Sequence, residues 1–87
     1  MIRLRFTGHI KTSMGSDELL VPRESASVGE LFGLILSSRP ADIDHGFSAF
    51  NTLVVVNDEE VFSAASQRDR VISDGDEVML VPFSHGG

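Results

Sequence analysis

The chain has 87 residues, of which 41% are hydrophobic and 23% are charged, a composition typical of one compact domain and not of a disordered chain. Thirteen acidic residues against seven basic ones give a formal net charge of −6, which disfavours direct binding to nucleic acid or to anionic membrane. The absence of cysteine excludes disulfide scaffolds, thiolate nucleophiles and cysteine-ligated zinc. The apolar runs are far shorter than the ~20 residues that span a bilayer, and no secretory signal is visible, so we expect a cytoplasmic protein.

The first part of the chain predicts a β-hairpin. Residues 2–6 alternate apolar and charged side chains, as a strand with one buried face does. Gly8 and residues 12–16 have the composition of a turn, residues 18–21 form a second predicted strand, and Pro22 ends that strand.

A helix is predicted after the hairpin. Ser27 and Glu30 have the spacing of a capping box, in which each side chain accepts a hydrogen bond from the other residue's backbone N–H. The apolar residues that then recur on one helical face are Val28, Leu31, Leu34 and Ile35. Pro40 stops this pattern just after Arg39, whose charge suits the negative end of a helix. Residues 42–50 favour either a loop or a short second helix.

Short strands separated by tight turns are predicted for the second half. The predicted strands are residues 52–56, 61–62 and 77–81. The first of these is rich in β-branched residues, which suits a strand covered on both faces. Asn57-Asp58 and residues 73–76 have turn chemistry, and Pro82 is expected to end the pairing of the last strand because it has no N–H to donate.

This order of elements predicts an α+β fold. Two hairpins with one helix between them place the first and last strands side by side and parallel at the centre of a mixed sheet. That arrangement is the β-grasp, or ubiquitin-like, fold, with one main helix packed on one face of the sheet. We assign residues 1–83 to this domain and residues 84–87 to a flexible C-terminal tail.

The tail ends on Gly86-Gly87, and its carboxylate belongs to Gly87. Glycine has no Cβ, so such a backbone can enter a channel that a larger residue would block. Four extended residues of ~3.3–3.6 Å each reach about 13–14 Å from the domain, which suits a carboxylate that another enzyme activates. The alternative is a frayed chain end without a role.

Four segments of the C-terminal part carry a family resemblance. They are Val54-Val55-Val56-Asn57, Ser73-Asp74-Gly75-Asp76-Glu77-Val78, Val81-Pro82-Phe83 and Gly86-Gly87. In these segments the chain resembles the ubiquitin-like sulfur carriers, which include the small subunit of molybdopterin synthase, ThiS-type thiamin carriers and Urm1-type carrier/modifiers. The exit Pro82-Phe83-Ser84-His85 departs from the two prolines and small residue usual in the molybdopterin synthase subunits, which leaves the pathway open.

The resemblance implies a mechanism in which partner proteins do the catalysis. An E1-like enzyme would use ATP to adenylate the carboxylate of Gly87, and a sulfur donor would convert it to a thiocarboxylate. The sulfur acceptor expected first is a molybdopterin precursor, reached in a complex with the large subunit of molybdopterin synthase. The chain itself would bind no cofactor and would be a carrier, not an enzyme.

Two alternatives to this carrier remain. A Urm1-like protein would be conjugated to lysines of target proteins or would carry sulfur for tRNA thiolation, and self-linked chains would form through Lys11, the only lysine, or the N-terminal amine. A protein of another class would be a non-covalent ubiquitin-like binding module whose tail is idle.

A partner-binding surface is predicted on the last strand. Val78 and Leu80 should face the helix, which leaves an apolar group rimmed by charge on the opposite face of the sheet. The predicted partner-binding residues are Met79, Val81, Phe83, His85, Arg3 and Arg5. The alternative is that these are ordinary half-covered strand residues and a solvated histidine. We expect no metal site, because His9, His45 and His85 lack the spacing of a ligand set.

Overall fold

The computed structural model describes residues 1–38 and 51–83. The helices and strands of these residues are, in chain order, β1 (Ile2–Phe6), α1 (Gly8–Met14), β2 (Glu18–Val21), β3 (Ser25–Ser27), α2 (Val28–Ser38), β4 (Thr52–Val56), β5 (Glu60–Ser63), β6 (Val71–Ser73) and β7 (Glu77–Pro82).

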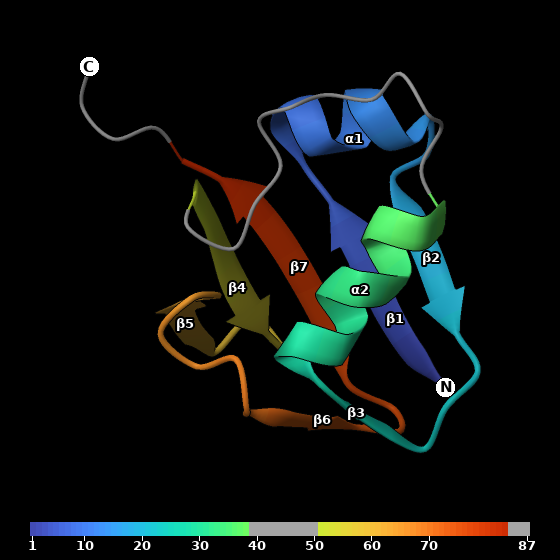
Figure 1. Cartoon of the computed structure of the whole chain (residues 1–87), viewed down its shortest axis with the longest axis vertical. Helices are drawn as coiled ribbons and strands as arrows, with labels where there is room; N and C mark the ends of the chain where they lie inside the picture. The colour runs from blue at the N-terminus through green and yellow to red at the C-terminus, as the bar shows by residue number, and fades with distance from the viewer. Residues whose placement is uncertain (39–50, 84–87) are drawn as a thin grey trace.

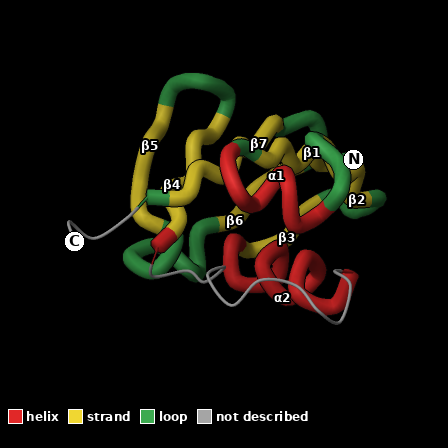
Figure 2. The backbone as a smooth tube through the Cα atoms, turned by 90° about the horizontal axis from the view of Figure 1, so that it is seen from above, coloured by secondary structure: helices red, strands yellow, loops and turns green. Residues whose placement is uncertain are grey.

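One mixed sheet has the strand order β2-β1-β7-β4-β5, and β3 and β6 pair in a separate two-stranded sheet. β1 and β7 are parallel, and the other pairings are antiparallel. α2 lies across one face of the large sheet (Figure 1), and in the view from above it forms its own layer beside the strands (Figure 2). The predicted α+β β-grasp fold, with parallel first and last strands at the centre, is confirmed.

The hydrophobic core lies between α2 and the inner face of this sheet. Burial along β1 alternates as predicted, with Ile2, Leu4 and Phe6 buried and the two arginines between them exposed. The other strands of the sheet and α2 contribute Val54, Val56, Val78, Leu80, Val28, Leu31 and Ile35 to the same core. Burying each such side chain stabilises the fold by about 1.5–3 kcal/mol, so this layer holds the sheet and α2 together.

The connection between β1 and β2 is a helix, where the sequence predicted a turn. The two strands do pair as a hairpin would, from Ile2 opposite Val21 onward. The residues between them form α1 because Ile10 is buried and Met14, one turn later, packs partly against the same core. Gly15 ends the helix in the left-handed conformation, with φ +71°, so one of the predicted turn residues acts as a helix C-cap.

The capping box at the start of α2 is confirmed. The backbone N–H of Ser27 donates to Oε1 of Glu30 at 2.9 Å, and the N–H of Glu30 donates to Oγ of Ser27 at 3.1 Å. These bonds, with the guanidinium of Arg23 beside them, lower the pKa of Glu30. Ser27 also ends the short strand β3, which the sequence analysis did not predict. Residues 39–50, including Arg39, Pro40 and the loop or helix expected over 42–50, lie outside the described residues.

The three strands predicted in the second half are present as β4, β5 and β7, whereas the short strand β6 was not predicted. β4 is buried on the α2 side and half-buried on the other, so it is only partly covered on its second face. Asn57 and Asp58 both have positive φ, 51° and 59°, as the central residues of a type I′ turn do. The prediction that Pro82 ends the pairing of the last strand was wrong, because Pro82 lies within β7 and pairs with Thr52 of β4. A proline is tolerated there because its nitrogen faces the side of β1, and β1 ends at Phe6, opposite Leu80.

Among the described residues, neither helix has the length and apolarity needed to cross a bilayer.

Candidate functional site

The predicted reactive group is at the end of the chain, and the structure describes the point from which the chain leaves the domain. Gly86, Gly87 and the predicted partner contact His85 lie outside the described residues. The last described residue is Phe83, which directly follows β7. We call residues Leu80–Phe83 the exit of β7.

The exit of β7 is fixed from both sides. On the side of β1, the backbone N–H and the hydroxyl of Thr7 both donate to the carbonyl of Leu80, at 3.3 and 3.0 Å. On the side of β4, the N–H of Phe83 donates to the carbonyl of Asn51 at 2.9 Å. The backbone is therefore held in a defined position as far as Phe83, one residue beyond β7.

Gly8 is the third support of the exit. A Cβ at this position would lie 2.8 Å from Cγ of Pro82, closer than side chains pack, and Gly8 also has a φ of +57°. Both conditions require glycine, because other residues rarely adopt this backbone and would clash with the proline ring. Thr7 and Asn51 were not singled out from the sequence. The single glycine after the first strand was the available signal, and it was assigned to a turn.

The outer face of the sheet carries the predicted partner-binding residues. Met79 and Val81 point away from α2, because Val78 and Leu80, which alternate with them along β7, are buried in the core. Cross-strand register extends this face across β4 and β5. We call the resulting set the apolar patch: Leu53, Val55, Val61, Met79 and Val81. Four of them are half-buried and Val61 is 62% exposed, while Phe83 at the exit is half-buried.

The two predicted arginines border this patch on β1. Arg5 lies opposite Met79, and Arg3 lies opposite Glu77 in the parallel pairing. Both are exposed and form ion pairs on the same face: Arg3 with Glu18 at 3.3 Å and Glu77 at 3.7 Å, and Arg5 with Glu77 at 3.7 Å. Exposed ion pairs of this kind contribute ~0–1 kcal/mol each to the stability of the fold. The arginines can therefore give up these ion pairs and bind carboxylates of a partner at little cost. The structure therefore brings Arg3, Arg5, Met79 and Val81 onto one face, and their role in binding stays a prediction.

The opposite end of β7 is held by the residues of the family motif. Asn57 donates from Nδ2 to Asp76 at 3.0 Å and accepts from the N–H of Glu77 at 2.9 Å. Asp76 also accepts from the N–H of Ser73 at 2.8 Å. The Ser73 amide, the Asn57 side chain and the charge of Arg70 lower the pKa of Asp76. These residues close the turn between β6 and β7 and link it to the β4–β5 turn, as expected for capping side chains without a catalytic role.

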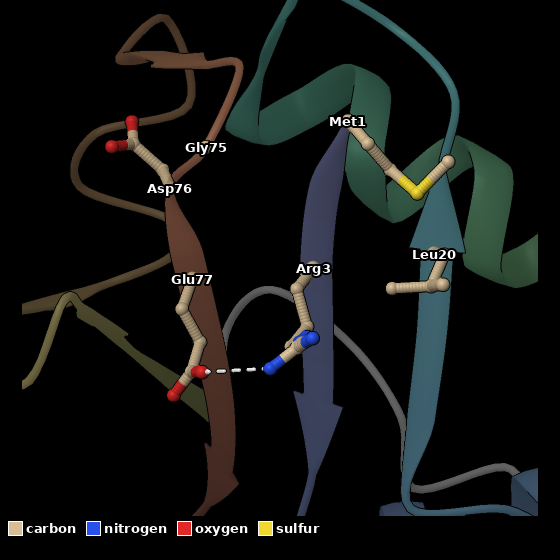
Figure 3. A pocket seen from close by; sticks show the side chains of 6 residues that line it. All are labelled: Met1, Arg3, Leu20, Gly75, Asp76 and Glu77. Carbon is tan, nitrogen blue, oxygen red and sulfur yellow. Dashed lines mark ion pairs between the residues drawn. The ribbon is translucent and has the colours of Figure 1, made fainter.

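A pocket of about 320 Å³ lies at this same end, lined by Met1, Arg3, Leu20, Gly75, Asp76 and Glu77 (Figure 3). The N-terminal amine forms an ion pair with Asp74, and the carbonyl of Met1 accepts from the N–H of Gly75 at 2.9 Å. Because β1 and β7 are parallel, the pocket is separated from the exit by the length of β7.

Among residues 1–38 and 51–83, no group of three or more metal-ligating side chains lies together. His9 is on α1, whereas His45 and His85 are outside the described residues.

Comparison with known proteins identifies the family. The model of the ThiS family matches residues 4–87. The chain belongs to the ThiS family, within the ubiquitin-like sulfur carriers. No curated protein matches it.

Solved structures share the fold of this ThiS-family chain. SAMP1 from Haloferax volcanii is 20% identical, with a TM-score of 0.71 over 99% of this chain and 98% of that one. A chain of the Amycolatopsis orientalis BexX/CysO complex is 16% identical, with a TM-score of 0.68 over the whole of both chains. A Pyrococcus furiosus structure described as molybdopterin converting factor, subunit 1, is 20% identical, with a TM-score of 0.63 over 95% and 97% of the two chains. Similarity at these identities establishes the β-grasp fold.

Proposed function

We propose that this chain is a sulfur carrier that acts through the carboxylate of Gly87. A family match that runs to the final residue carries this proposal, because it includes the terminal Gly-Gly together with the β-grasp domain. The fixed exit of β7 supports it, since a rigid domain would deliver a short arm to the same place in each partner.

The proposed reaction takes place in two steps on a partner enzyme. In the active site of an E1-like enzyme, the Gly87 carboxylate attacks the α-phosphate of ATP, so that an acyl-adenylate forms and pyrophosphate leaves. A sulfur donor then attacks the acyl carbon and displaces AMP, which leaves a thiocarboxylate on Gly87. The chain contributes the acyl group and the docking surface, and its partners supply the catalytic groups. In this role the chain is not an enzyme and works in the cytoplasm without a bound cofactor.

The sulfur acceptor we propose first is a precursor of molybdopterin, with the large subunit of molybdopterin synthase as the second partner. The Pyrococcus structure described as molybdopterin converting factor, subunit 1, supports this choice, since it shares the fold over nearly the whole chain. The second candidate is a protein modifier, because similar folds include one described as small archaeal modifier protein 1. In that case a lysine of a target protein would receive the acyl group of Gly87, or a tRNA-thiolation pathway would receive the sulfur of its thiocarboxylate.

Docking of these partners is proposed on the apolar patch and its border. Met79 and Val81 offer apolar area and Arg3 and Arg5 offer charge, while Phe83 and His85 are the proposed contacts closest to the terminus in the sequence. An apolar centre with a charged rim is the usual composition of such an interface.

Removing Gly87 tests the proposed function against a non-covalent binding module. We expect the truncated chain, and a chain with one residue added after Gly87, to bind the E1-like enzyme but to support no ATP–pyrophosphate exchange. Met79→Asp is the matched variant, because it leaves the tail intact and should weaken binding instead. A full chain that binds the enzyme but supports no ATP–pyrophosphate exchange would instead indicate a binding module with an idle tail.

A further inference from the structure

We propose that β2 is a self-pairing edge, through which two copies of the chain join in an antiparallel β2–β2 contact centred on Leu20. β2 is the outermost strand on one side of the large sheet (Figure 1). The contact places Leu20 opposite Leu20 of the second copy and joins two five-stranded sheets into one of ten strands. This inference does not depend on the proposed function.

The backbone of Leu20 points out of the sheet. The N–H of Phe6 donates to the carbonyl of Asp17 at 3.0 Å, and opposed residues of an antiparallel ladder alternate between bonded and non-bonded pairs. Leu20 is three residues after Asp17 and opposite Arg3, so it belongs to a non-bonded pair. The N–H of Arg3 agrees with this phase, since it donates to the carbonyl of Asp76 on the other side, at 3.1 Å. The N–H and C=O of Leu20 are therefore directed away from β1, and no described residue bonds to either.

The backbone groups on either side of Leu20 fit this pairing. Oγ of Ser16 donates to the carbonyl of Glu18 at 2.8 Å and accepts from the N–H of Glu18 at 3.2 Å. In the pairing, Glu18 lies opposite Pro22 of the second copy, since each is two residues from Leu20. Pro22 has no N–H to donate, and the Glu18 carbonyl opposite it is already supplied by Ser16. The two hydrogen bonds between the Leu20 residues thus form without leaving this carbonyl unpaired.

The charges that flank β2 are complementary to themselves. Asp17 precedes the strand and Arg23 follows it, and each is three residues from Leu20. An antiparallel pairing centred on Leu20 therefore brings Asp17 of each copy toward Arg23 of the other, twice by symmetry. Both side chains are exposed, and Arg23 already binds one carboxylate, that of Glu30, in an exposed ion pair at 3.1 Å. The edge requires an acidic residue, an apolar centre and a basic residue in the order of its own sequence, which favours a second copy over an unrelated strand.

An apolar groove beside β2 is covered by the same contact. The groove has a volume of about 280 Å³ and is lined by Leu19, Leu20, Val21, Pro22, Arg23 and Leu34. Leu19 and Val21 face the core side of the sheet, since Leu4 and Ile2 opposite them are buried. In the pairing, Leu19 lies beside Val21 of the second copy, so the two grooves meet. Leu20, which is 45% exposed, lies beside its counterpart on the outer face, and burial of this apolar surface drives the contact.

The other edge of the sheet lacks this symmetry. The N–H of Ala64 donates to the carbonyl of Thr52, and Val61 is three residues earlier, so the backbone of Val61 also points outward. A β5–β5 pairing centred on Val61 would place residues 58–60, which are all acidic, opposite residues 62–64, of which none is basic. The backbone geometry is thus common to both edges, whereas the complementary charges belong to β2.

The pairing leaves the proposed docking surface uncovered. The apolar patch spans β7, β4 and β5, and β1 separates these strands from β2. A pair of chains therefore presents two exits of β7, each open to a partner. Because each chain has a net charge of −6, the two copies repel each other, and we expect a weak pair that forms at high protein concentration.

Hydrogen exchange and sedimentation of the full chain test the pairing. At about 0.15 M salt, which screens charges beyond roughly 8 Å, sedimentation velocity should show monomer converting to dimer as the protein is raised from micromolar to millimolar concentration. Over the same range, solvent exchange measured by NMR should slow several-fold at the amide of Leu20. The amide of Val61 is the matched control, since it points outward from the opposite edge, and its exchange rate should not change.

A charge swap identifies the surface. Asp17→Arg should weaken self-association about tenfold or more, because it sets like charges across the contact twice. Arg23→Asp should do the same, and an equal mixture of the two variants should restore association as a heterodimer. Glu59→Arg makes the same change in net charge as Asp17→Arg but lies at the β4–β5 turn, so it should not weaken the pair.

Three results would overturn the proposal. One is a chain that stays monomeric up to millimolar concentration, which would mean that this edge is closed or serves a different protein. The second is a dimer that survives both Asp17→Arg and Arg23→Asp. The third is slowed exchange at Val61 in place of Leu20, which would assign self-association to β5. None of them bears on the charging of Gly87, which is measured with a partner enzyme.

Discussion

The two ends of β7 are built in different ways. The first end, at the turn that Gly75 and Asp76 form before Glu77, is closed by side chains, above all by the amide of Asn57. The exit at Leu80–Phe83 is instead held by Thr7, by a close contact with Gly8 and by a backbone hydrogen bond from Phe83 to the carbonyl of Asn51. Thus the polar side chains of the family motif stabilise the first end of β7. The exit, which carries the proposed function, depends instead on backbone hydrogen bonds and on close packing at Gly8.

The largest effect on stability is expected at the exit. Gly8→Ala forces an L-residue into positive φ, which costs about 1–2 kcal/mol, and crowds Pro82, which adds about 1–3 kcal/mol. Gly15→Ala is the matched control, because φ is also positive there but no atom lies within 4 Å of the new Cβ, so it should lose about 1 kcal/mol. Urea unfolding measures both, and equal losses would show that the contact with Pro82 is unimportant.

A smaller loss is expected at the opposite end. Asn57→Ala removes the bridge to Asp76 and Glu77 and should lower the free energy of unfolding by about 2 kcal/mol. Asp58→Ala is the comparison, because Asp58 has the same backbone conformation and is exposed, and it should cost about 1 kcal/mol. Denaturant titration of the two variants separates the side-chain bridge from backbone strain. If Asp58→Ala lost as much stability as Asn57→Ala, the hydrogen bonds of Asn57 to Asp76 and Glu77 would contribute nothing measurable.

The turn also predicts a pH dependence. The pKa of Asp76 is lowered in the folded protein, chiefly by the Ser73 amide and then by the Asn57 side chain. The stability from this carboxylate is thus complete above the unfolded pKa of about 3.9, and is lost as pH falls through the lower folded pKa. Asp76→Asn should flatten the acid limb of a plot of unfolding free energy against pH. Asp58→Asn removes an equal charge without these bonds, so matching curves for the two variants would refute the assignment.

The smallest change is expected on the outer face, between the two ends. Arg3→Ala breaks exposed ion pairs with Glu18 and Glu77 and should alter the free energy of unfolding by no more than ~0.5 kcal/mol. The same variant should slow association with an acidic partner surface, measured by stopped-flow binding, and the slowing should shrink at high salt. A large loss of stability would mean that this face is structural.

Local patterns in the sequence predicted much of the fold. Alternation in β1, the capping box of Ser27 and Glu30, and the turns at Asn57 and Gly75 each have a short-range cause, and each is present. The sequence also predicted that Met79 and Val81 share a face with Arg3 and Arg5, since strand alternation and parallel pairing fix that arrangement.

The features that sequence analysis missed depend on tertiary contacts. α1 forms because Ile10 has a core to pack against, and its residues alone have the composition of a turn. Pro82 remains within β7 because its missing N–H is on the side where β1 has ended, which no local pattern reveals. The requirement for glycine at position 8 comes from Pro82, 74 residues away in the chain.

The central claim is that Gly87 is charged by another protein, and intact mass spectrometry tests it most directly. The full chain is incubated with ATP, a sulfide source and an E1-like enzyme whose activity on its own carrier is verified. We expect a mass increase equal to the exchange of one oxygen for one sulfur, located on Gly87 by fragmentation and absent without ATP. An unchanged mass with the active enzyme, under conditions in which the two proteins bind each other, would contradict the claim.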